Sequence, residues 1–119
     1  MFINLTNHSS EYWGYKQINA SQEYGEIIDI RPPVITGETK DEEISELVES
    51  YVKRIIDLAP ACILVQAEYV FTHRLVNQLK KRNIFVVAAV SDKRSIEFLN
   101  ENNNTERTSE FEFVRYREY

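Results

Sequence analysis

Residues 61–90, ACILVQAEYVFTHRLVNQLKKRNIFVVAAV, decide the fold class of this chain. The stretch begins and ends with apolar runs, 61–67 and 84–90, that lack the alternation of a half-exposed strand. Uninterrupted apolar runs of this length predict strands covered on both faces, as in parallel sheets. Residues 69–82 between them carry apolar side chains at helical spacing and end in basic residues. This order of strand, helix and strand predicts a right-handed parallel crossover.

The succession of strands and helices extends toward the N-terminus. Residues 2–5 and 26–30 predict two further strands, and residues 10–23 predict a helix between them. From Ile44 to Ile56, apolar residues recur every three or four positions, which predicts an amphipathic helix. The order βαβαβαβ predicts an α/β fold, a compact Rossmann-like three-layer sandwich with four parallel strands.

The C-terminal part of the chain has a different pattern. Residues 110–117 alternate in polarity, and residues 101–105 have the composition of a turn. We therefore expect an antiparallel edge strand, or a hairpin that pairs it with residues 94–99. The length of 119 residues predicts a single domain over 1–119.

Composition narrows the classes of function. The formal net charge of -5 argues against a surface for long nucleic acids, which are bound by basic domains. The one cysteine, Cys62, excludes an intrachain disulfide and favours a reducing compartment. No apolar stretch reaches the roughly 20 residues that span a bilayer, and no signal peptide is evident. We expect a cytoplasmic protein without membrane contact.

Polar segments follow each predicted strand. They are residues 6–10, Arg31, Gln66 with Glu68 and then Thr72 and His73, and residues 91–94. Ligands of open α/β sheets bind beyond the carboxyl ends of the strands, so these segments are expected to converge at one site. His8 suits an acid, a base or a phosphate donor near neutral pH, or it is an ordinary loop histidine.

The other candidates each have two interpretations. Ser9 and Ser10 suit helix caps whose free amides can also bind an anion. Trp13 suits stacking on a base, or the core. The remaining candidates either bind ligand or are ordinary loop, cap and surface residues, and they are Thr6, Asn7, Gln66, Glu68, Thr72, Ser91, Lys93 and Arg94. Among them, Gln66 suits an adenine edge, and Lys93 and Arg94 suit phosphate.

Several motifs are missing from the sequence. It contains three glycines and neither a G-x-G-x-x-G fingerprint nor a P-loop, which disfavours dinucleotide and NTPase chemistry. The two histidines, His8 and His73, do not form a metal signature. We expect no cofactor and no metal.

Five segments together resemble a known family: INLTNHSS…W, YGEIIDI, LVQAE…T, LVNQLKKRNIFVVAAVS and FEFVRYREY. The chain resembles small CRISPR-associated accessory proteins of the type III ring-nuclease kind. The resemblance implies a Rossmann-like homodimer that binds cyclic oligoadenylate, often the tetramer, across its two-fold axis. Several members of that family cleave this second messenger without metal and so end the antiviral signal.

The resemblance also implies site roles. Asn7, His8 and Ser9 match the family's opening polar motif, and Gln66 and residues 91–94 occupy positions of further ligand contacts. In a ring nuclease, His8 would donate a proton or hold phosphate, and Lys93 or Arg94 would stabilise the developing charge. Two alternatives stay open at this stage: a sponge or sensor that binds a nucleotide without cleaving it, and an interaction module that docks a partner through residues 111–119.

Overall fold

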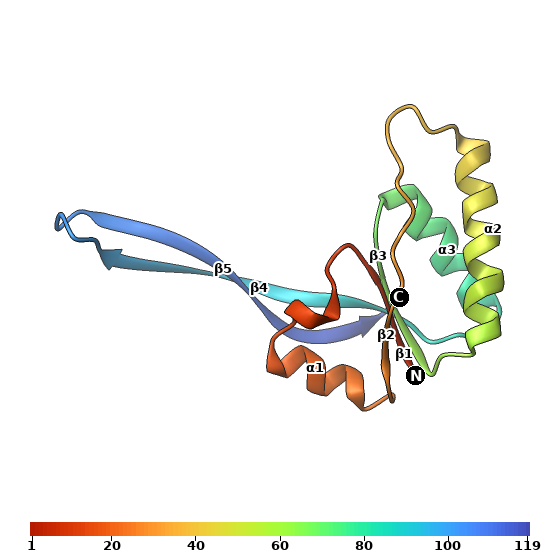
Figure 1. The fold of residues 1–119 in the computed structure, drawn as a ribbon, viewed down its shortest axis with the longest axis horizontal. Coiled ribbons are helices and arrows are strands. Elements are labelled where there is room, and N and C mark those ends of the chain that lie inside the picture. The colour runs from red at the N-terminus through yellow and green to blue at the C-terminus, as the bar shows by residue number, and fades with distance from the viewer.

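The computed structural model describes the backbone of residues 1–119 and every side chain except those of Arg94, Ile96, Thr108 and Ser109. The elements, labelled in Figure 1, are β1 (Phe2–Thr6), the 3-10 turn η1 (Ser10–Tyr12), α1 (Tyr15–Gln22), β2 (Ile27–Asp29), α2 (Asp41–Leu58), β3 (Cys62–Gln66), α3 (Tyr69–Lys81), β4 (Val86–Leu99) and β5 (Thr105–Glu118). The predicted α/β class is confirmed.

One mixed sheet, mostly parallel, organises the chain in the strand order β2-β1-β3-β4-β5. β1 pairs in parallel with β2 and β3, and β3 pairs in parallel with β4 at Ile63↔Val86 and Leu64↔Val87. β5 returns antiparallel to β4. The carboxyl ends of β1 and β3 therefore lie side by side. The parallel pairing of β3 with β4 confirms the crossover that residues 61–90 predicted.

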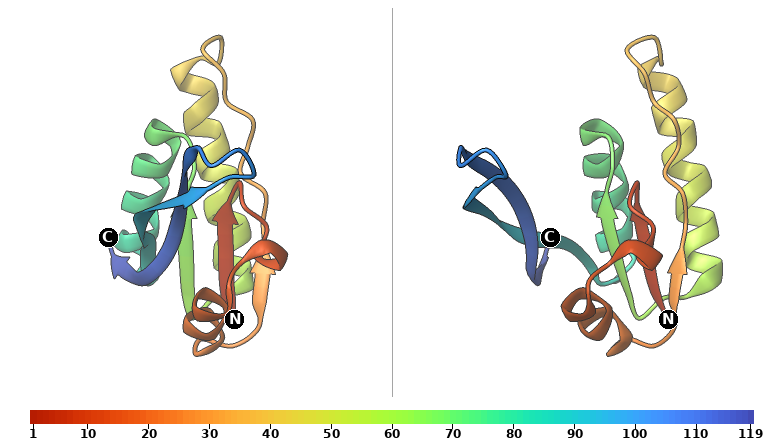
Figure 2. Two further views of the ribbon diagram at one scale, coloured as in Figure 1. Left: turned by 90° about the vertical axis from the view of Figure 1, so that its left-hand side faces the viewer. Right: turned by 60° about the vertical axis from the view of Figure 1, so that its left-hand side comes forward.

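Alternate residues of the central strands feed two cores. One set, which includes Ile3, Ile63 and Val86, packs with the buried stripes of α2 and α3. The other set, Phe2, Cys62, Leu64 and Val87, packs under Trp13, Tyr24 and Tyr116 on the opposite face of the sheet, where α1 lies (Figure 2). The uninterrupted apolar runs are explained by this burial of both faces. Burial also raises the pKa of the Cys62 thiol to about 12.

The predicted helix over 10–23 is interrupted. η1 ends at Tyr12, Trp13 and Gly14 are extended, and α1 begins at Tyr15. Ser9 occupies the cap position of η1 but makes no side-chain cap bond there. The hydroxyls of Ser9 and Ser10 bind the Asp29 carboxylate instead, so a contact across the sheet overrides the local capping preference.

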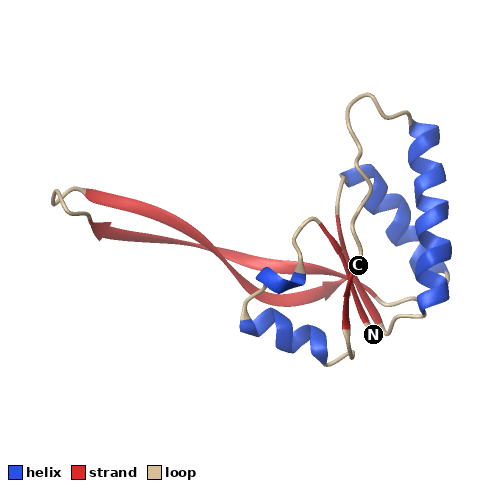
Figure 3. Ribbon diagram, viewed as in Figure 1, coloured by secondary structure: helices blue, strands red, loops and turns tan.

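The predicted hairpin is present, and it is much longer than the sequence suggested. β4 does not stop near residue 90: residues 91–94 continue the strand, so the alternative that they form a loop is wrong. The pairing with β5 runs to Leu99↔Thr105, with a β-bulge between Val90 and Ser91. The distal hairpin projects from the body as an arm (Figures 1 and 3). The radius of gyration is 17.3 Å, against about 13.5 Å for a chain of this length without such an arm.

No helix among the described residues is long and apolar enough to cross a membrane.

Candidate functional site

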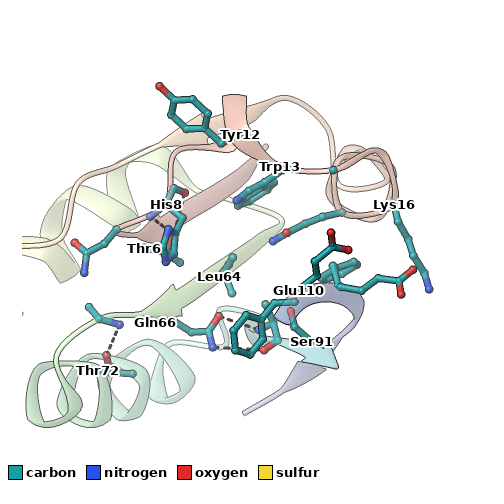
Figure 4. Close-up of a pocket in the computed structure, with 18 of the residues that line it drawn as sticks. Thr6, His8, Tyr12, Trp13, Lys16, Leu64, Gln66, Thr72, Ser91 and Glu110 are labelled. Carbon is teal, nitrogen blue, oxygen red and sulfur yellow. Dashed lines mark hydrogen bonds between the residues drawn. The ribbon is translucent and has the colours of Figure 1, made fainter. Parts of the chain in front are cut away.

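An open pocket of about 1150 Å³ lies beyond the carboxyl ends of β1 and β3. The β1–α1 connection forms one wall, and the base of the β4–β5 arm forms the other (Figure 4). Seven of the predicted site residues line it: Thr6, Asn7, His8, Trp13, Gln66, Thr72 and Ser91. These residues therefore lie together at one pocket, whereas Arg31, which follows β2 and was expected to converge with them, does not line it.

Four other candidates do not line this pocket. Ser9, Ser10, Glu68 and Lys93 lie outside its walls. The side chain of Arg94 lies outside the described part of the structure, and its backbone belongs to β4. Any role that these residues have toward a ligand stays a prediction.

A hydrogen-bond network fixes the segment that carries His8. Asn4, which is buried, donates from Nδ2 to the His8 carbonyl and to Oδ1 of Asp29, each at 2.8 Å. The Thr6 hydroxyl donates to Oδ1 of Asn4 at 2.8 Å and accepts from the His8 amide at 3.2 Å. The backbone of His8 is thus held from both sides, while its side chain is exposed at the pocket (Figure 4).

Asp29, at the end of β2, anchors this network and was missed in the sequence. Its carboxylate accepts from Asn4, from both seryl hydroxyls and from the Ser10 amide. Burial raises the pKa of Asp29, but these hydrogen bonds to the charged form outweigh it, and the pKa is lowered. The amide of Ser10 already donates to the Asp29 carboxylate of the protein itself, so this amide is not free for an external anion.

The residues after β3 are largely committed to structure. Gln66, the last residue of β3, uses its side chain to continue the pairing with β4. Its Oε1 accepts from the Ala89 amide at 3.2 Å, and its Nε2 lies 3.4 Å from the Ala89 carbonyl. The Thr72 hydroxyl accepts from the Ala67 amide at 3.0 Å. Glu68 is the N-cap of α3 and accepts from the Phe71 amide at 2.7 Å, so its position is explained by capping.

The C-terminal strand contributes a wall that sequence reasoning did not assign to the site. Phe113 and Tyr119 line the pocket, and the Tyr119 hydroxyl donates to the Val65 carbonyl at 2.7 Å. Tyr116 packs on Phe2 and bonds to Ser21 at 2.7 Å. Burial raises the pKa of Tyr116 and of Tyr119 above the ordinary value of a tyrosine. Polarity alternation predicted Phe111, Phe113 and Tyr116 as inward residues, but Phe111 is 76% exposed, and the pattern did not show what the strand would face.

Charge and aromatic rings are unevenly distributed around the pocket. Lys16, near the start of α1, is the cation of the lining, and Glu110 and Glu112 on β5 are its carboxylates. Exposed rings stand around the opening, among them Tyr12 and Tyr15 at 82% exposed and Tyr69 at 91%. This arrangement offers flat surfaces for stacking and separates donors near β1 from acceptors on the arm.

Among the described residues, no group of three or more His, Cys, Asp and Glu side chains is placed so that it could hold a metal ion. His8 is the one histidine among the described residues that line the pocket, and an imidazole there can give or accept a proton.

Comparison with curated protein sequences gave no match. A family model described as the uncharacterized protein MJ1673 family matches residues 1–117. The match spans the sheet, the pocket and the arm, so it concerns the whole fold described above. The chain belongs to the uncharacterized protein MJ1673 family.

Proposed function

We propose that this pocket binds a cyclic oligoadenylate, the tetramer, and that His8 assists its cleavage. The observation that carries the proposal is the convergence of His8 with exposed aromatic rings at the carboxyl edge of the sheet. The resemblance of the sequence to ring nucleases supports the same ligand class. In this proposal the subunit is a Rossmann-like three-layer unit that acts as a homodimer.

The size and lining of the pocket support an oligonucleotide more than a single nucleotide. Its volume of about 1150 Å³ exceeds the roughly 300–1,000 Å³ typical of sites for drug-sized ligands. Adenine bases stack on aromatic faces whatever the sequence, and the rings of Trp13, Tyr15 and Tyr69 supply such faces. The adenine amino group is a donor, which suits the carboxylates of the arm wall. Phosphates would then face His8 and Lys16.

The proposed reaction is an intramolecular transesterification. A ribose 2′-oxygen forms a bond to the adjacent phosphorus while the bond from phosphorus to the 5′-oxygen breaks, leaving a 2′,3′-cyclic phosphate on a linear product. The 2′-hydroxyl proton passes to solvent, and the imidazolium of His8 gives a proton to the departing 5′-oxygen. No metal or cofactor is required, because alignment and charge stabilisation account for most of the rate.

A second candidate has its own supporting observation. Carboxylates on the arm wall repel the negative charge that builds up on phosphorus, and Lys16 is the cation that lines the described pocket. This favours a sponge or sensor that binds the ligand without cleaving it.

Incubation with cyclic tetra-adenylate in the presence of EDTA, followed by chromatography, separates the candidates. We expect linear products, and we expect His8→Ala to lower the rate about ten-fold or more while binding is retained. His73→Ala, which changes the other histidine on α3 outside this pocket, is the matched control and should behave as wild type. Retained but intact ligand identifies the sponge. Absence of binding overturns the proposal and leaves the interaction module.

A further inference from the structure

The distal arm of β4 and β5 lacks the support that a β-ribbon needs in water. Residues 91–99 of β4 pair with β5 on one side, and in the described backbone no strand pairs with their other edge. Figure 1 shows the ribbon standing clear of the helices and the rest of the sheet. Two-stranded ribbons are marginally stable alone, and a free edge is a template for pairing with another strand.

We propose that the arms of two copies of this chain pair along their free β4 edges, antiparallel, with the two-fold axis at Ser95. The result is a four-stranded ribbon in the order β5-β4-β4-β5. This inference comes from the arm alone and does not depend on the ligand of the pocket.

Symmetry restricts the register. A two-fold axis normal to a sheet keeps each side chain on its own face, so the numbers of two directly opposite residues differ by an even number. The axis then passes between the two copies of one residue, which face each other. Ser95 is the midpoint of the free edge from Ser91 to Leu99. A register centred there uses the whole edge.

On the face of the edge that carries Lys93, Ser95 and Glu97, the charges are self-complementary in this register. Lys93 of each copy lies opposite Glu97 of the other, so the axis creates two opposite-charge pairs on one face. Both side chains are exposed, and Glu97 already binds Arg107 of its own arm at 2.6 Å. Cross-strand pairs of opposite charge stabilise a sheet, and like charges in the same place destabilise it.

The register also brings the partner to the pocket. Leu99, which is 68% exposed in one chain, lies opposite Ser91 of the other. Ser91 lines the pocket and pairs with Phe113, another lining residue. Each arm therefore adds an apolar side chain to the open wall of the other copy's pocket, next to a small residue that leaves room for it.

A cysteine at the axis tests the register. Ser95→Cys places two thiols directly opposite each other, and mild oxidation is expected to yield a disulfide-linked dimer. Ser50→Cys, an exposed position on α2, is the matched control and should stay monomeric under denaturing electrophoresis. The native Cys62 is buried with a raised thiol pKa and does not compete.

Charge exchange tests the chemistry. Lys93→Glu or Glu97→Lys alone should weaken dimerisation about ten-fold in sedimentation velocity, because either change converts both opposite-charge pairs across the axis into like-charge pairs. The variant that carries both changes together with Arg107→Glu keeps an opposite charge beside position 97 within the arm, and it should restore the affinity to within about three-fold of wild type. Wild-type protein that stays monomeric at about 100 µM overturns the proposal. So does a dimer that this triple variant fails to restore, or one that crosslinks through β5 and not through Ser95.

Discussion

β4 passes through two environments that differ in what holds them together. At its start, Val86 and Val87 are buried on opposite faces of the sheet, each in one of the two cores. Beyond the bulge at Val90 and Ser91, the same strand runs through solvent with β5 as its one described neighbour. Backbone pairing with β5 resumes directly after the bulge, yet the burial of side chains stops there. The comparison teaches that strand pairing extends an element, whereas burial of side chains stabilises it.

The sharpest test of this contrast changes one residue type in both regions. Leu75 on α3 is fully buried, so Leu75→Ala should lower the free energy of unfolding by about 3 kcal/mol through lost burial and a cavity. Leu99→Ala, in the arm, should change it by less than about 0.5 kcal/mol when measured on dilute monomer. Urea denaturation followed by circular dichroism measures both. Equal losses at the two sites would mean that the arm belongs to the same cooperative unit as the body.

A second pair of changes probes the polar part of the body. Asn4→Ala removes the donor that holds the His8 carbonyl and the Asp29 carboxylate, and we expect a loss of about 2 kcal/mol. Asn7→Ala, three residues along and exposed, is the matched control and should change stability by less than about 0.5 kcal/mol. A near-neutral Asn4→Ala variant would show that the network does not fix this segment.

The smallest expected effect depends on pH. Folding lowers the pKa of Asp29, so its contribution is present above the unfolded value of about 3.9 and is lost as the pH falls through the folded value. Asp29→Asn should therefore cost about 1 kcal/mol at pH 7, and this difference from wild type should shrink below about pH 4.

Urea denaturation of both proteins at pH 7, 5 and 3 measures that difference. Asp92→Asn, in the arm, provides the control and should change stability by less than about 0.3 kcal/mol at each pH. A deficit of Asp29→Asn that is the same at all three pH values would contradict the assigned hydrogen bonds.

Local patterns predicted what is local in this structure. The crossover of 61–90 and the stripe of α2 have strong periodicity and buried partners, and the structure contains both. The break in the helix over 10–23 could not be predicted, because Ser9 and Ser10 bind the carboxylate of Asp29, which lies about twenty positions further along the sequence. The length of the arm was hidden because the polar residues after Val90 have the composition of a loop.

The candidate site was predictable on one side only. The rule that ligands bind beyond the carboxyl ends of strands predicted the lining residues that lie at or after the ends of β1 and β3. The other wall comes from β5, whose antiparallel return brings Phe113 and Tyr119 back to the pocket from the far end of the chain. The sequence predicted an antiparallel edge strand or hairpin, but it did not indicate that the returning strand would line the pocket. The nature of the ligand stays a proposal based on resemblance and on the lining of the pocket.

The side chain of Gln66 imitates a stretch of backbone, and this limits what can replace it. Its amide presents an acceptor and a donor to Ala89 in the same order as a peptide group. Glutamate has the length but offers two acceptors, so it would set a carboxylate oxygen against the Ala89 carbonyl. Asparagine has both groups but is one methylene too short. Position 66 is therefore selective for a single amino acid for reasons of chain geometry, even if no ligand ever touches it.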